Sequence, residues 1–178
     1  MQEYFLINWN GGVTFTGGDP LVQIDFLIEM CKKLKENNIN VVIDTAGNFN
    51  ITDKVKELLK YVDLVMLDVK HIDDNTHTYL TGSSNEKILN FGRYLSDNNI
   101  PVRIRIVYLP TITDDKEENI IKLKEYIKNI KTLEKVEVLP YHTMGISKWK
   151  ELGLKYELNE LKEPTKEKLI SFENYLKI

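Results

Sequence analysis

Residues 13–20 read Val-Thr-Phe-Thr-Gly-Gly-Asp-Pro, and the rest of the chain is interpreted outward from this stretch. Its first four residues are β-branched or aromatic, which predicts a short buried strand. Gly17 and Gly18 follow where the strand must turn, and glycine lets a backbone approach another molecule closely. Asp19 and Pro20 then open a segment with helical periodicity, and proline suits the first helical turn. This arrangement suits either a binding site for a cationic group such as an amine, or an ordinary βα turn with an N-capping aspartate.

The composition is that of a soluble globular protein, and we assign residues 1–178 to a single domain. Hydrophobic residues make up 42% of the chain and charged residues 29%. The net charge of −3 provides no basic surface for nucleic acid. No apolar run approaches the roughly 20 residues of a membrane span, and the first residues do not form a signal peptide. We therefore expect a cytoplasmic protein with no nucleic-acid or membrane partner.

Apolar segments that end in polar residues alternate with amphipathic segments along the chain. This alternation is typical of βαβ units and a parallel sheet. Strands are predicted over residues 13–16, 40–47, 63–70, 102–109 and 135–140. Helices are predicted over residues 21–37, 51–61, 86–98, 116–130 and 164–176, with shorter helices within 71–81 and 147–154. The continuous apolar runs also predict that both faces of the sheet are covered.

Polar residues follow the predicted strands at the point where each strand ends. The set comprises Gly17, Gly18, Asp19, Asp44, Thr45, Asp68, Lys70, Arg105 and His142. Parallel strands bring their carboxyl ends to one edge of the sheet, where (β/α) barrels and open α/β sheets bind their ligands. We therefore expect these residues to meet in one ligand-binding site.

Several chemistries are open at this edge. Asp44 and Asp68 can bind a cation, or the amine and hydroxyl groups of a ligand, and Arg105 suits a carboxylate. Lys70 points to the same face as Asp68, so it either pairs with that carboxylate or acts as the Schiff-base nucleophile of an aldolase-like lyase. His142 is either a proton donor, a ligand contact or a hydrogen-bonded loop residue.

The stretch around the glycine pair resembles the glycine-glycine-glutamate segment of the radical S-adenosylmethionine (SAM) enzymes, with aspartate in place of glutamate. Residues 42–47, 64–81 and 139–145 extend the resemblance to one branch of that superfamily, the glycyl-radical-enzyme activases. The Asp-x3-His-x3-Thr-Gly pattern of this branch is matched by Asp73, His77, Thr81 and Gly82. The matching segments lie in the family's order and cover essentially the whole chain.

The resemblance implies a binding role for most of the polar residues at the sheet edge. SAM would be bound through Gly17, Gly18 and Asp19 at its amino group, through Lys70 and Arg105 near its carboxylate, and through Asp44, Thr45, Asp68 and His142. A monovalent cation beside the SAM carboxylate would be held by Asp44, Thr45, Met66 and Asp68. Because Asp19 is one methylene shorter than the family's glutamate, we expect Asp19→Glu to tighten SAM binding.

The resemblance also implies an activity and its partners. In such enzymes a reduced 4Fe–4S cluster cleaves SAM to a 5′-deoxyadenosyl radical, which removes a hydrogen atom from a backbone glycine of a glycyl radical enzyme. Pyruvate formate-lyase is the favoured partner, and a flavodoxin or ferredoxin is the expected reductant. The partner's peptide would approach the loop that contains Asp73, His77, Thr81 and Gly82.

The chain departs from the family at the cluster. The family holds its cluster with a Cys-x3-Cys-x2-Cys loop upstream of the glycine pair, whereas Cys31 is the only cysteine here and follows the pair. Three thiolates are needed, so the cluster would belong to the full-length parent only. We therefore expect part of a (β/α)6 barrel, with about five parallel strands and outer helices, that lacks the first βα unit and is inactive as it stands. The alternatives are a cluster-free module that binds SAM or the partner, and the lyase that uses Lys70.

Overall fold

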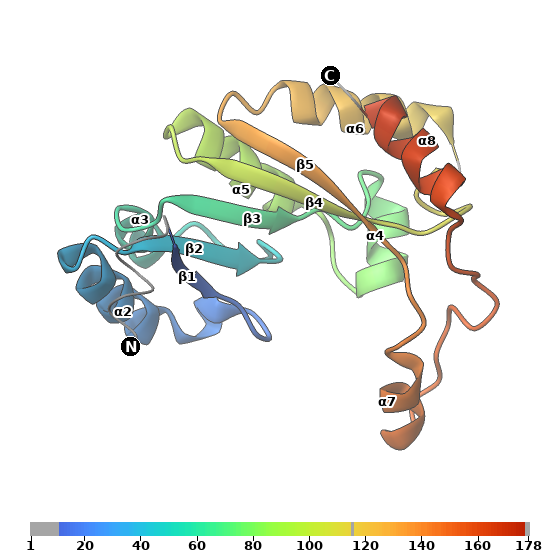
Figure 1. Ribbon diagram of the computed structural model, residues 1–178, viewed down its shortest axis with the longest axis horizontal. Helices are drawn as coiled ribbons and strands as arrows, with labels where there is room; N and C mark the ends of the chain where they lie inside the picture. Colours follow the sequence, from blue (N-terminus) through green and yellow to red (C-terminus); the bar gives the residue numbers. More distant parts are fainter. Residues whose placement is uncertain (1–10, 115, 177–178) are drawn as a thin grey trace.

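The computed structural model describes residues 11–114 and 116–176. Five strands in these residues form one parallel sheet whose strand order follows the sequence (Figure 1). They are β1 (Gly12–Phe15), β2 (Asn40–Thr45), β3 (Leu64–Asp68), β4 (Val102–Tyr108) and β5 (Leu133–Pro140). The predicted α/β class, with five parallel strands and helices between them, is confirmed.

Helices follow each of the five strands, as the periodicity predicts. They are α2 (Ile24–Glu36), α3 (Asp53–Leu59), α4 (Asp74–Thr81), α5 (Glu86–Asp97), α6 (Glu117–Lys128), α7 (Ile146–Glu151) and α8 (Lys166–Leu176). The helix predicted from residue 21 begins instead with a 3-10 turn, η1 (Pro20–Gln23). The reason is local, because Asp19 accepts hydrogen bonds from Leu21 N through its side chain and from Val22 N through its carbonyl. None of the helices in the described residues is long and apolar enough to cross a membrane.

One face of the sheet is buried and the other is partly open among the described residues. Along β4, Val102, Ile104 and Ile106 are buried, whereas Arg103 and Arg105 alternate with them on the half-buried face. The prediction that both faces are covered is therefore wrong for this part of the chain. Helices α2, α3, α5, α6 and α8 supply the apolar side chains that pack on the buried face, as in the outer layer of a barrel.

The core under the helices has two parts. The larger one joins the buried face of β3 and β4 to α5, α6 and α8, with Phe91, Leu95 and Ile127 among its most buried side chains. The smaller one packs α2 and α3 against β2, and its members are Leu27, Ile28, Cys31, Val41, Ile43 and Leu58. Both parts leave the carboxyl ends of the strands free to carry polar groups.

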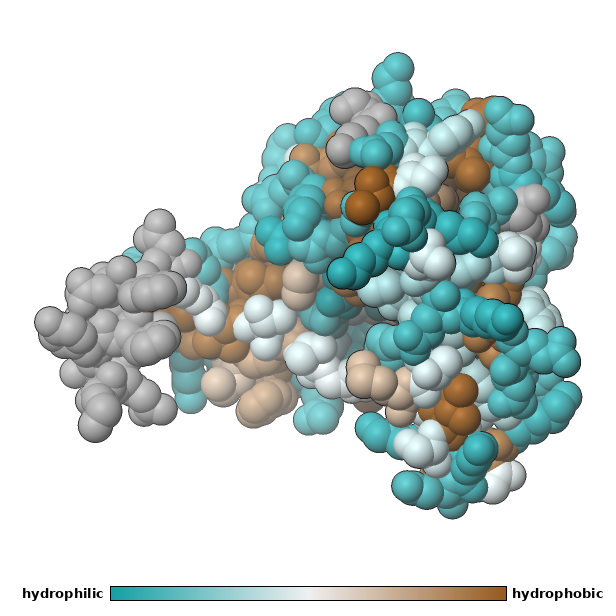
Figure 2. Space-filling view, turned by 45° about the vertical axis from the view of Figure 1, so that its right-hand side comes forward, coloured by the Kyte–Doolittle hydropathy of each residue, from teal (hydrophilic) through white to brown (hydrophobic). Residues whose placement is uncertain are grey.

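The segment between β5 and α8 projects from the body of the molecule and carries α7 at its tip (Figure 1). Trp149 in α7 packs edge-on against Tyr156, whose hydroxyl lies 2.7 Å from the hydroxyl of buried Tyr141 at the end of β5. Met144 and Leu152 are exposed, and the lowest lobe in Figure 2 shows brown residues among teal ones. The contacts from Trp149 to Tyr156 and from Tyr156 to Tyr141 thus link the projecting segment to the end of β5.

Candidate functional site

The strand register brings the predicted acids and bases together at the carboxyl edge of the sheet. Asp68 pairs with Arg105 across β3 and β4, and Asp44 pairs with Met66 across β2 and β3. Paired residues in neighbouring strands point to the same face, so all four side chains belong to the half-buried face. The sequence prediction that these residues gather at one edge is consistent with this register.

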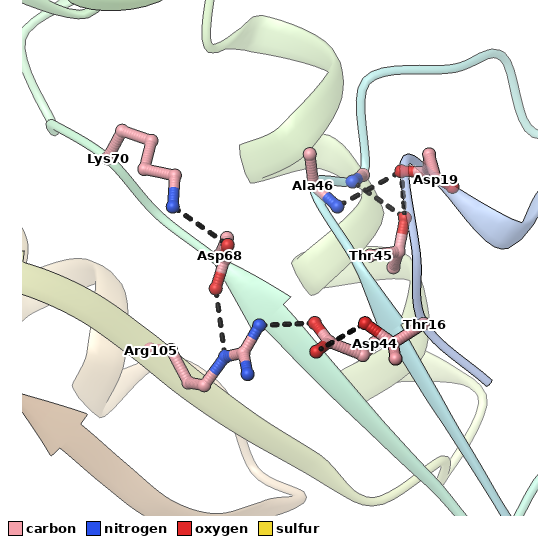
Figure 3. Close-up of polar contacts among 9 residues, drawn as sticks. Thr16, Asp19, Asp44, Thr45, Ala46, Asp68, Lys70 and Arg105 are labelled. Atoms are coloured by element: carbon pink, nitrogen blue, oxygen red, sulfur yellow. Dashed lines mark hydrogen bonds and ion pairs between the residues drawn. The ribbon is translucent and has the colours of Figure 1, made fainter. Parts of the chain in front are cut away.

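Arg105 lies between two carboxylates (Figure 3). Its Nε donates to Asp68 Oδ1 at 2.9 Å and its Nη2 donates to Asp44 Oδ1. Lys70 Nζ donates to the second oxygen of Asp68 at 2.8 Å, and Thr16 Oγ1 donates to the second oxygen of Asp44 at 3.1 Å. The side chains of Asp44, Asp68 and Arg105 are 17%, 19% and 18% exposed. We call the four charged residues Asp44, Asp68, Lys70 and Arg105 the charged network.

The charged network has a direct effect on Arg105. Burial by itself would lower the pKa of the guanidinium, but the charges and hydrogen bonds of Asp68 and Asp44 outweigh burial and raise it. Lys70 forms the ion pair with Asp68 that the sequence left open. This geometry favours a structural and electrostatic role for Lys70 over the nucleophile of an aldolase-like lyase.

Asp19 joins the loop after β1 to the loop after β2 (Figure 3). Its Oδ2 accepts from Thr45 Oγ1 at 2.7 Å and from Ala46 N at 3.1 Å, while its Oδ1 accepts from Leu21 N at 3.0 Å. Thr45 Oγ1 in turn accepts from Gly47 N at 3.0 Å. Of about four acceptor positions on a carboxylate, three are therefore used within the protein and one remains for a ligand.

This geometry reverses the expected effect of Asp19→Glu. The Asp19 carboxylate reaches Leu21 N, two residues along the chain, and two donors on the neighbouring loop at the same time. A glutamate would carry its carboxylate one methylene further from its own backbone, and could not keep all three bonds. We now expect the substitution to weaken the site.

The glycine pair leaves an open backbone next to Asp19. Gly17 has a φ of +133°, and a Cβ built on Gly17 or Gly18 would meet no atom within 4 Å. The space over this turn is open, and only glycine adopts the Gly17 conformation readily. A small ligand can therefore approach the backbone here, as the sequence predicts.

Two predicted site residues stand apart from the charged network. His142 follows β5 and is exposed, and no hydrogen bond between described residues joins its side chain to the network. Met66 lies on the same face as Asp44, but no side-chain hydrogen bond is described for it. Their proposed contacts with SAM and with a cation therefore remain predictions.

The four residues of the Asp-x3-His-x3-Thr-Gly pattern shape the two ends of α4. Asp73 caps the first turn by accepting from Thr76 N at 2.9 Å, and this bond lowers the pKa of the Asp73 carboxyl. His77 is buried, and its Nδ1 lies 2.8 Å from Ser83 O. Thr81 Oγ1 donates to His77 O at 2.9 Å.

Gly82 follows α4 at a φ of +77°, with its N–H bonded to Thr78 O at 2.8 Å. The side chains of Asp73, His77 and Thr81 thus bond within their own segment. Their role in partner binding stays a prediction. In that role these residues would set the shape of the loop that the partner contacts.

Sequence reasoning missed two residues that support the site. Thr16 bonds to Asp44, and its place at the end of a predicted strand, directly before the glycine pair, was a usable signal. Asn85 is buried and donates from Nδ2 to His71 O at 3.1 Å and to Ile72 O at 2.8 Å, which fixes the loop after β3. No sequence pattern points to Asn85, because its partners are backbone carbonyls in another segment.

Cys31 is unsuited to binding a cluster. It lies in α2 with no exposed surface, and burial raises the pKa of its thiol to about 11. No group of three or more His, Cys, Asp or Glu residues in the described ranges could hold a metal ion. Cys31 is a core residue, as its position on the apolar stripe of the predicted helix indicates.

The burial of Cys31 predicts a slow thiol reaction. In the native protein we expect Ellman's reagent to modify Cys31 only as fast as the protein opens, whereas in urea the one thiol should react at once. The measurement is the absorbance of released thionitrobenzoate with and without urea. Complete labelling of the native protein at the rate of a small-molecule thiol would contradict the buried position.

The arrangement is suited to a zwitterionic ligand. The charged network offers both a guanidinium and carboxylates at the sheet edge, and the Gly17 turn offers open backbone next to Asp19. An amino acid group carries one ammonium and one carboxylate, so both of its charges would find partners here.

Comparisons with known proteins identify the family of this chain. The sequence profile of the Radical SAM superfamily matches residues 2–123, more than half of the chain. Pyruvate formate-lyase-activating enzymes from Staphylococcus epidermidis and from Staphylococcus aureus strain USA300 are each 48% identical over 162 residues. The match covers 88% of this chain and 64% of each relative, so the chain spans just under two thirds of their length.

Solved structures share the fold. A domain of a pyruvate-formate lyase-activating enzyme from Bacteroides vulgatus is 26% identical, with a TM-score of 0.75 over 93% of this chain and 92% of that one. Streptococcus suis SuiB bound to S-adenosylmethionine is 21% identical, with a TM-score of 0.64 over 92% of this chain and 34% of SuiB, and this likeness concerns the fold alone. The partial barrel predicted from the sequence is confirmed. The chain is a homologue of the pyruvate formate-lyase-activating enzymes and belongs to the radical SAM superfamily.

Proposed function

We propose that this chain is the SAM-binding and partner-facing part of an activase that generates the glycyl radical on pyruvate formate-lyase. The observation that carries the proposal is the charged network beside the open glycine turn, at the carboxyl edge of a radical SAM sheet. The similarity to pyruvate formate-lyase-activating enzymes supports the partner. A flavodoxin or ferredoxin would be the reductant of the whole enzyme.

The residues present fit the methionyl group of SAM. The ammonium would bind the remaining acceptor position of Asp19 and the carbonyl groups of the glycine turn, while Arg105 and Lys70 would attract the carboxylate. His142 would close the site from the end of β5. In this role the chain binds and orients its ligand.

A monovalent cation is the second ligand proposed for this edge of the sheet. Asp44 and Asp68 bond to two different nitrogens of the Arg105 guanidinium, so both carboxylates face the same positive group. Carboxylate oxygens are the ligands that hard cations prefer. Thr45 and Met66 are the further proposed ligands, although Thr45 Oγ1 donates its hydrogen to Asp19.

The residues present do not fit a 4Fe–4S cluster. Such a cluster, together with SAM, supplies the radical that takes a hydrogen atom from the partner's glycine, and it needs three thiolates. This chain has a single cysteine, and that thiol is buried in α2. We therefore propose that residues 1–178 act as one domain without catalysis of their own. The same observation favours the second candidate, a cluster-free module that binds SAM or the partner.

Binding of S-adenosylhomocysteine tests the proposal. We expect calorimetry in sodium buffer to detect binding by the 178-residue chain, and Asp68→Asn to weaken it about tenfold or more, because Asp68 orients both Arg105 and Lys70. Asp25→Asn, which alters an exposed ion pair on α2, is the matched control and should bind as the wild type does. No binding by the wild type would overturn the proposal.

A further inference from the structure

The chain leaves the sheet at Lys70, one of the four residues of the charged network. β3 ends at Asp68, and Val69 N still donates to Arg105 O at 2.9 Å, but no backbone hydrogen bond to another described residue holds Lys70 itself. The next residue, His71, is buried, with 3% of its surface exposed. We propose that His71 is a positioning residue, which holds Lys70 within reach of Asp68 by tying the loop after β3 to the loop after β4. This inference rests on the proposed function and adds a supporting residue to the same site.

The His71 imidazole bonds to both loops. Asp73 N donates to its Nδ1 at 3.0 Å, and lies closer to that atom than Asp73 O does at 3.3 Å. Because an N–H can only donate, Nδ1 is the acceptor and the imidazole proton lies on Nε2. Nε2 then donates to Ile112 O at 3.2 Å, in the loop after β4. One imidazole thus joins two loops whose bonded residues lie 41 positions apart in the sequence.

The loop after β4 is a well-ordered attachment point for His71. Thr113 N donates to Leu109 O at 2.8 Å, while Thr113 Oγ1 accepts from Leu109 N at 2.9 Å and donates to Val107 O at 3.2 Å. On the other side, the carbonyl of His71 accepts from Asn85 Nδ2 at 3.1 Å. His71 is therefore held through its side chain and its backbone, directly after the lysine of the charged network.

A fixed backbone beside Lys70 matters because its ion pair is partly open to water. The Lys70 side chain is 34% exposed, and its Nζ donates to Asp68 Oδ2 at 2.8 Å (Figure 3). Such a pair must offset the entropy lost when two side chains are ordered, and a free backbone would add its own ordering cost. Without the bonds of His71, we expect Lys70 to leave Asp68 for part of the time. The carboxylate of the ligand would then lose one of the two charges that attract it.

Calorimetry with S-adenosylhomocysteine compares the wild type with three variants. We expect His71→Leu to bind about tenfold more weakly, which is the order of the cost of ordering one freed residue. Glutamine carries an acceptor and a donor on one planar group, as the imidazole does, so His71→Gln should bind within about threefold of wild type.

Ser96→Ala is the matched control for the loss of a buried bond. Ser96 is also 3% exposed, and its Oγ accepts from Lys131 N at 2.8 Å, in the segment that leads into β5. Its replacement should lower the midpoint of urea unfolding and leave the affinity for S-adenosylhomocysteine as in the wild type. A general loss of stability would therefore appear in both His71→Leu and Ser96→Ala, whereas the positioning effect would appear only at His71.

NMR of the lysine side chains gives a readout that needs no ligand. In the wild type, the Lys70 ammonium should give a resolved ¹H–¹⁵N signal, because its ion pair slows exchange with water, and Lys70→Met assigns that signal. The signal should disappear in His71→Leu and remain in His71→Gln and Ser96→Ala, and far-UV circular dichroism checks that the variants fold.

Three outcomes decide between the claims. Unchanged binding by His71→Leu, or a Lys70 signal that persists in it, would overturn the role of His71. A wild type without the Lys70 signal would overturn it as well, and this outcome depends on no variant that might fail to fold. If the wild type does not bind S-adenosylhomocysteine at all, the proposed function is refuted, while the NMR comparison still tests His71.

Discussion

Replacing Gly47 with alanine is expected to lower the free energy of unfolding by about 2–5 kcal/mol, the sum of backbone strain and overpacking. Gly47 has a φ of +72°, and a Cβ there would lie 2.6 Å from Leu67 Cδ1. Leu67 is fully buried in the larger core and cannot move away freely. The measurement is the midpoint of urea unfolding at equilibrium.

Two other glycines separate the causes of this loss. Gly82 has a φ of +77° but no atom within 4 Å of its Cβ position, so Gly82→Ala should show strain alone, about 1–2 kcal/mol. Gly145 has a φ of −78° and open space, so Gly145→Ala should stay within about 0.5 kcal/mol of wild type. If Gly47→Ala were no more destabilising than Gly82→Ala, the close contact with Leu67 would contribute nothing to the loss in the free energy of unfolding.

Replacing Asp19 is expected to have the largest effect on ligand binding. Asp19→Ala removes three internal hydrogen bonds and the remaining acceptor for an amine, and a bond to a charged group contributes about 1.5–3 kcal/mol. We therefore expect S-adenosylhomocysteine to bind about 10- to 100-fold more weakly, because each 1.4 kcal/mol is a factor of ten. Calorimetry under the conditions used for Asp68→Asn gives the comparison.

The conservative changes at Asp19 make the test specific. Asp19→Glu keeps the charge but loses the simultaneous reach to Leu21, Thr45 and Ala46, so its binding should also weaken. Asp19→Asn keeps the shape but has one acceptor oxygen for three donors, so its NH2 group must face at least one of them and binding should weaken as well. A glutamate variant that binds as tightly as wild type would show that the bond geometry of Asp19 does not determine affinity.

The fold class was readable in the sequence because its causes are local. Apolar runs that end in polar residues identify strands, and helical periodicity identifies the segments between them. Parallel strands in chain order then bring Asp44, Asp68 and Arg105 to one edge. The 3-10 turn before α2 was missed because it depends on the particular bonds of Asp19 to Leu21 and Val22.

The sequence by itself determined the order of the elements, the polar edge of the sheet, the core position of Cys31 and the family. Only the tertiary structure decided which groups meet. The strand register brings Arg105 next to Asp68 and Asp44, which lie 37 and 61 residues away in the sequence. The same register leaves one face of the sheet half-buried, where continuous apolar runs predict two covered faces. The tertiary structure also decided that the Asp19 carboxylate already accepts three hydrogen bonds, which reversed the expected effect of Asp19→Glu on ligand binding. Pairing across strands depends on twist, register and packing of the whole sheet, and no local pattern encodes these.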